Sequence, residues 1–61
     1  MKMWIARDLG GELVLYDRKP YKKDNYWGCD DKCDFMPMND RLFPEVTFDN
    51  SPQEVELVIK K

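Results

Sequence analysis

The chain has 61 residues, of which 43% are hydrophobic and 36% are charged, and its formal net charge is −2. This length allows one small domain over residues 1–61, and the composition is too apolar for a disordered segment and too charged for a membrane protein. The chain has no histidine, one serine and one threonine. Most histidine-based and serine-based catalytic schemes are thereby excluded, and we expect a protein that is not an enzyme.

The first two strands are predicted from apolar alternation on both sides of a glycine turn. Residues 2–8 and 12–18 read as strands, and in the first strand Arg7 shares one side with Met3 and Ile5. The connecting Asp-Leu-Gly-Gly segment is typical of a turn, because glycine adopts positive φ at little steric cost. We therefore expect a β-hairpin at the start of the chain.

The rest of the chain is divided by prolines and by clusters of turn-forming residues. Pro20 cannot donate to a strand ladder, so residues 19–25 are expected to form a loop. Asn39 suits the N-cap of one helical turn near 39–43, which Pro44 ends. The further extended segments that we predict are 26–29, 33–36, 45–48 and 54–59. Four or five short strands joined by turns indicate an all-β fold, either an antiparallel meander or a small SH3-like barrel.

The predicted strands carry more apolar residues than one buried sheet face requires. The first face collects Ile5, Leu13, Leu15, Val55, Leu57 and Ile59. The second face collects Trp4, Ala6, Val14, Tyr16 and Val58. In one interpretation the 19–45 segment folds over the second face and supplies Phe35, Leu42, Phe43 and Phe48 as a lid. In the other, Trp4, Val14, Tyr16 and Val58 bind a partner protein or a second copy of the chain, because exposed apolar patches usually mark interfaces.

Cys29 and Cys33 are separated by three residues, two of which are aspartates. A structural zinc site needs a second pair of Cys or His residues, which this chain lacks, so we expect no metal and no other cofactor. Two cysteines are too few for a secreted disulfide scaffold, and the first residues do not resemble a signal peptide. We therefore expect reduced thiols in a cytoplasmic protein. A disulfide is the alternative if residues 30–32 form a hairpin loop.

Bases and aromatic residues alternate over residues 16–27. This pattern favours single-stranded nucleic-acid binding, in which a basic track is combined with rings that stack on bases. The residues involved would be Arg18, Lys19, Tyr21, Lys22, Lys23 and Trp27. The net charge of −2 argues against this function, because nucleic-acid modules are usually basic. Nucleic-acid binding is therefore the alternative to protein–protein contact, and no membrane partner is expected.

Both ends of the chain carry recognisable segments, whereas residues 21–38 do not. The segments are MKMWIARD at 1–8, GELVLY at 11–16, Lys19-Pro20, LFPEVTF at 42–48, Pro52 and EVEL at 54–57. They resemble a family of short uncharacterised proteins of gut bacteria and their phages or mobile elements. The resemblance implies no activity, cofactor or site residue. It implies an accessory factor of a mobile element, and an inhibitor of a host or rival system would fit that class.

Overall fold

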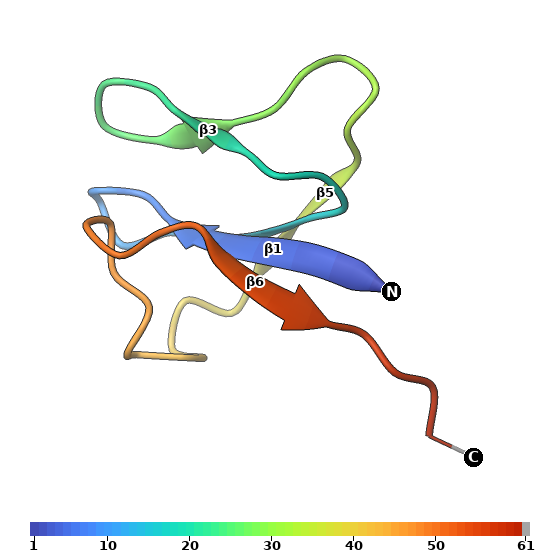
Figure 1. Cartoon of the computed structure of the whole chain (residues 1–61). Coiled ribbons are helices and arrows are strands. Elements are labelled where there is room, and N and C mark those ends of the chain that lie inside the picture. Colours follow the sequence, from blue (N-terminus) through green and yellow to red (C-terminus); the bar gives the residue numbers. More distant parts are fainter. Residues whose placement is uncertain (61) are drawn as a thin grey trace.

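The structure is a computed structural model that describes residues 1–60 of the chain. Within these residues it confirms an all-β fold, with six short antiparallel strands in two sheets and no helix (Figure 1). The strands are β1 (Lys2–Arg7), β2 (Leu13–Tyr16), β3 (Tyr21–Lys22), β4 (Trp27–Gly28), β5 (Phe35–Met38) and β6 (Gln53–Glu56). No helix within residues 1–60 is long and apolar enough to cross a membrane.

The predicted hairpin is confirmed and forms the centre of the main sheet. This sheet has four strands in the order β5-β2-β1-β6. The turn between β1 and β2 is closed by hydrogen bonds from the Asp8 N–H to the Glu12 carbonyl at 2.8 Å and from the Gly11 N–H to the Asp8 carbonyl at 2.9 Å. Gly11 has a φ of 99°, which side chains other than glycine's rarely tolerate. Glycine at this position therefore allows the tight reversal.

The middle of the chain pairs differently from its prediction. Residues 21 and 22, expected in a loop, form β3 and pair with β4 in a second sheet of two strands. The strand predicted at 33–36 begins at Phe35 instead and pairs with β2. Pro37 lies within this strand opposite Val14. Proline is tolerated there because β5 is an outer strand, and its missing N–H faces away from β2.

The helical turn predicted near 39–43 is not formed. Phe43 has a φ of 49°, outside the right-handed helical region. The carbonyls of Asp40, Leu42 and Phe43 accept hydrogen bonds from the side chain of Arg7. In a helix they would face N–H groups four residues further along the chain. Asn39 still closes a single turn, since its carbonyl accepts the Leu42 N–H at 3.1 Å and its side chain accepts the Arg41 N–H at 2.9 Å, but Phe43 does not continue it as a helix.

The last strand is shorter than predicted and ends at Glu56. The Leu57 N–H still donates to the Met1 carbonyl at 2.9 Å, but β1 provides no partner for the residues that follow. Leu57 and Ile59 are 55% and 83% exposed. Their predicted place in the core is therefore wrong.

Two hydrophobic cores lie on opposite faces of the main sheet. One contains Ile5, Leu13 and Val46, with Leu15, Met38 and Val55 packed against them. The other contains Ala6, Tyr16, Trp27 and Cys33, with Val14, Cys29 and Phe48 packed against them. Figure 1 shows the β3–β4 hairpin on one side of the main sheet and the 39–46 segment on the other. The lid interpretation is correct for Phe48 but not for Phe43, which lies on the opposite face beside Ile5.

Candidate functional site: an apolar groove beside a clamped loop

The four residues predicted as an interface do not share one exposed face. Tyr16 is 3% exposed, whereas Val58, beyond the end of β6, is 72% exposed. Trp4 and Val14 are half-buried. The chain's own segments therefore cover most of this face, and Tyr16 acts as a core residue.

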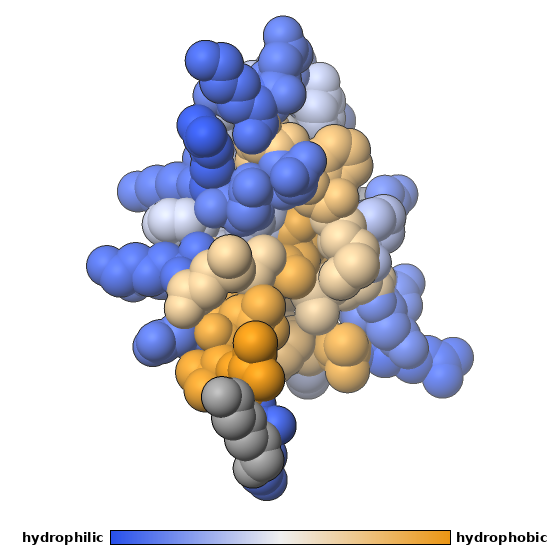
Figure 2. All heavy atoms as spheres, turned by 90° about the vertical axis from the view of Figure 1, so that its right-hand side faces the viewer, coloured by the Kyte–Doolittle hydropathy of each residue, from blue (hydrophilic) through white to orange (hydrophobic). Residues whose placement is uncertain are grey.

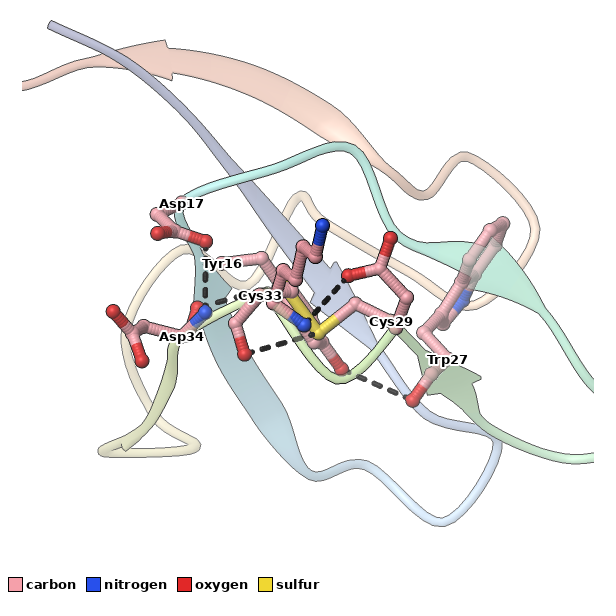
Figure 3. The surroundings of a disulfide bond; sticks show 8 residues. Tyr16, Asp17, Trp27, Cys29, Cys33 and Asp34 are labelled. Carbon is pink, nitrogen blue, oxygen red and sulfur yellow. Dashed lines mark hydrogen bonds between the residues drawn. A yellow bond between two sulfur atoms is a disulfide. The ribbon is translucent and has the colours of Figure 1, made fainter.

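Tyr16 belongs to the hydrophobic core of the covered face, together with Trp27 and Cys33 (Figure 3). Its hydroxyl donates to the Trp27 carbonyl at 3.0 Å. The Asp8 carboxylate accepts the backbone N–H of Trp27 at 2.9 Å, which connects the first turn to β4. Burial, and secondly the negative charge of Asp8, raise the pKa of Tyr16 from 10.0 to about 12. These contacts join the two sheets and give Tyr16 a structural role.

Cys29 and Cys33 form a disulfide, so the expectation of reduced thiols is wrong. Their Cα atoms are 5.8 Å apart, and residues 30–32 form the loop between them, as the alternative interpretation requires. The Asp30 side chain accepts the Lys32 N–H at 3.0 Å, and its carbonyl accepts the Cys33 N–H at 3.1 Å. Among residues 1–60 there is no cluster of three or more His, Cys, Asp or Glu side chains that could hold a metal ion.

The stacking ring expected at Trp27 belongs to the core. Trp27 is 9% exposed, and its ring centroid lies 6.3 Å from that of Phe48. Lys22 covers the same pair, with its Nζ atom 4.3 Å from the Phe48 ring centroid and 6.0 Å from that of Trp27. Two of the six predicted nucleic-acid contacts thus serve the packing of the β3–β4 hairpin.

Other members of the basic and aromatic stretch remain at the surface. Tyr21 and Tyr26 are each 48% exposed. The Nζ atom of Lys23 lies 5.3 Å from the first ring and 5.6 Å from the second. Arg18 and Lys19 are exposed in the preceding segment. The structure therefore leaves one aromatic and basic surface on this hairpin.

The uncovered apolar surface lies on the opposite face of the main sheet. One hollow of about 190 Å³ is lined by residues of β1, β2, β5 and β6. A second hollow of about 230 Å³ adjoins it and is bordered by Asp17 and Asp34. Methionine side chains are flexible and polarisable, so such a surface can adapt to apolar groups of different shapes. We call this surface the methionine groove and define it as Met3, Leu15, Met36, Met38, Phe43 and Val55.

Arg7 holds the loop that forms one wall of the methionine groove. Its guanidinium donates to the carbonyls of Gly11 at 2.7 Å, Asp40 at 2.9 Å, Leu42 at 2.9 Å, Phe43 at 3.1 Å and Val46 at 2.5 Å. All five N–H donors of the guanidinium are thus used. Sequence reasoning missed this role, because backbone carbonyls leave no pattern in the sequence. The one available signal was an arginine on the same side of its strand as Ile5.

Phe43 adopts a strained conformation at the edge of the groove. Its φ of 49° lies in the left-handed region, which residues other than glycine seldom adopt. The Val46 N–H donates to its carbonyl at 2.9 Å, and Arg7 holds the same carbonyl. The ring is 43% exposed and lines the groove beside Val55. Strained residues of this kind cluster at binding sites, so the groove is the candidate site.

No protein family, curated protein or solved structure matches this chain. The candidate site therefore rests on the geometry of the described residues. The resemblance to short proteins of gut bacteria and their phages stays a prediction.

Proposed function

We propose that this chain is a small non-enzymatic protein that acts by binding another protein through the methionine groove. The composition of the groove and its exposure to solvent support this proposal. Met3, Met36 and Met38 line an open apolar surface, and the strained loop holds Phe43 at its wall. Methionine and aromatic residues are enriched at the centres of protein interfaces.

Charges around the groove indicate the chemistry of the partner. Asp17 and Asp34 border the hollow beside Met36. A neighbouring hollow on the same face is also lined by Glu45. A partner that presents one large aliphatic or aromatic side chain, flanked by Lys or Arg, complements both the apolar groove and its acidic rim.

A display library of random peptides tests this proposal without assuming the partner's identity. We expect the immobilised chain to enrich peptides in which a large apolar residue adjoins basic residues. Met36→Asp should weaken their binding about tenfold or more, because it places a charge in the groove. Met36 is 57% exposed, so this variant should stay folded.

Tyr21→Asp is the matched control, since it introduces the same charge at a residue that is 48% exposed on the β3–β4 hairpin. This variant should bind the peptides as the parent chain does. The absence of enriched peptides, or equal losses for both variants, would contradict the proposal.

Single-stranded nucleic acid is the second candidate ligand, favoured by the half-exposed rings of Tyr21 and Tyr26 on either side of Lys23. Filter binding at low salt tests it. Retention of an oligonucleotide that Tyr21→Ala abolishes and Met36→Asp preserves would favour this function over protein binding.

A further inference from the structure

β6 is an outer strand of the main sheet, and one of its edges is free in the described part of the chain. Met1 and Leu57 exchange hydrogen bonds just before the first residue of β1. In an antiparallel pair, successive residues turn their backbone groups alternately toward and away from the neighbouring strand. Val55 therefore faces β1, whereas the N–H and carbonyl groups of Glu54 and Glu56 face outward.

The two outer edges of the sheet differ in their capacity to accept another strand. β5 contains Pro37, which has no N–H to donate and blocks pairing at its outer edge. Neither β6 nor residues 57–60 contain proline. The free edge of β6 is thus the one suited to pairing.

An exposed apolar segment continues directly from β6. Leu57, Val58 and Ile59 are 55%, 72% and 83% exposed. Figure 2 shows hydrophobic atoms in a band that runs upward from the lower part of this view through its centre, between hydrophilic side chains. Figure 1 shows the same segment leaving the body of the sheet. Contiguous apolar surface of this kind usually marks an interface.

We propose that residues 54–60 of two copies of this chain pair as antiparallel strands about a two-fold axis at Leu57, which joins their main sheets into one. In this register Glu54 lies opposite Lys60 of the second copy, and Val55 lies opposite its Ile59. Glu56 and Val58 supply the outward backbone groups that form the new ladder. The pairing covers the apolar segment that follows β6.

Charge selects this register over its neighbours. An axis at Val55 would place Glu54 opposite Glu56, and an axis at Glu56 would place that residue opposite itself. Like charges directly opposite each other destabilise a sheet. The axis at Leu57 places each Glu54 between Lys60 of the second copy and its own Lys2, whose Nζ lies 3.8 Å from the Glu54 carboxylate. An axis at Val58 would also place opposite charges together, with Glu56 opposite Lys60. Within the described residues, however, it pairs only residues 56–60, which makes a shorter ladder than residues 54–60.

This pairing goes beyond the proposed function and does not depend on it. The dimer uses the edge of β6, whereas Met36 lies on β5, at the far side of the same sheet. Met36→Asp should therefore leave the dimer intact, and a change at Lys60 should leave peptide binding intact. Failure of one proposal is thus separable from failure of the other.

Sedimentation equilibrium over a concentration series tests the dimer. We expect reversible dimerisation that Lys60→Glu weakens about tenfold or more, because it places a glutamate opposite Glu54. Adding Glu54→Lys to that variant should restore dimerisation. Lys32→Glu is the control, since it makes the same change in the exposed loop between the cysteines. A monomer at every concentration, or equal effects of Lys60→Glu and Lys32→Glu, would overturn the proposal.

Cysteine substitution tests the register. Leu57→Cys should form a covalent dimer under mild oxidation, because Cα atoms of a pair without mutual hydrogen bonds lie about 4.5 Å apart, within disulfide range. Val58→Cys should not, since in this register residue 58 lies opposite Glu56. Cross-linking through residue 58 alone, or through neither residue, would refute the pairing. A monomer that binds only a separate basic and apolar peptide at this edge would also refute it.

Discussion

Arg7→Ala removes five hydrogen bonds, of which four fasten the loop of the methionine groove to the sheet and the fifth joins Arg7 to the Gly11 carbonyl in the first turn. The bonds to Gly11 and Val46 are part-buried, and at about 1.5 kcal/mol each they contribute about 3 kcal/mol. The other three acceptors are exposed and can exchange Arg7 for water, so we assign them no net contribution. A chain of 61 residues is stable by about 6 kcal/mol, at about 0.1 kcal/mol per residue. Loss of Arg7 should therefore remove about half of the stability.

Urea unfolding followed by tryptophan fluorescence measures this effect, because Trp27 is buried in the folded chain. With a slope of about 1 kcal/mol per molar urea, the midpoint should fall by about 3 M. Arg7→Lys should restore only part of the loss, since an ammonium group cannot span five separated carbonyls.

Arg41→Ala provides the matched control, because Arg41 is exposed in the same loop. Its removal should change the free energy of unfolding by less than about 0.5 kcal/mol. Equal effects of Arg7→Ala and Arg41→Ala would show that the guanidinium does not hold the loop, and the reasoning would be refuted.

Three further predictions concern stability. Between pH 10 and 12 an unfolded tyrosine loses its proton while folded Tyr16, with its pKa raised to about 12, keeps it, so stability should fall as the pH rises through this range. Tyr16→Phe should remove that part of the pH dependence in unfolding curves, and an unchanged slope would contradict the assignment. Gly11→Ala should cost about 1 kcal/mol or more in thermal unfolding, because its φ is 99°, whereas Gly10→Ala should cost less. Reduction, or Cys29→Ser with Cys33→Ser, should lower stability by about 2 kcal/mol, the loop-closure entropy of so short a loop. A double variant as stable as the oxidised parent chain would refute this last prediction.

The hairpin of β1 and β2 is predictable from sequence because its determinants are local. Strand alternation and the glycines of the turn lie within one continuous segment, and Gly11 adopts the positive φ that such turns require. The β3–β4 pairing is harder to predict, since two residues per strand provide no alternation to detect. Its position depends on distant contacts such as the Asp8 side chain with the Trp27 N–H.

The candidate site was less predictable than the fold. Apolar strands with two apolar faces indicate an interface, but composition alone does not show which face the chain covers itself. Trp27 and Phe48 pack on the face that contains Tyr16, and this leaves the face with Met3 and Met38 open. The loop beside the groove is held by a side chain that bonds to backbone carbonyls, which every residue carries.

Methionine-methyl NMR tests protein binding by the groove most directly. A chain labelled uniformly with ¹³C and ¹⁵N, in which the methionine methyl and aromatic signals are both observed, is titrated with an unlabelled peptide in which a large apolar residue adjoins lysines. The methyl signals of Met3, Met36 and Met38, which line the groove, should shift in proportion to bound peptide, while the indole signal of buried Trp27 stays in place. Unchanged methyl signals, with shifts confined to Tyr21 and Tyr26, would place binding on the opposite side of the sheet and contradict the account.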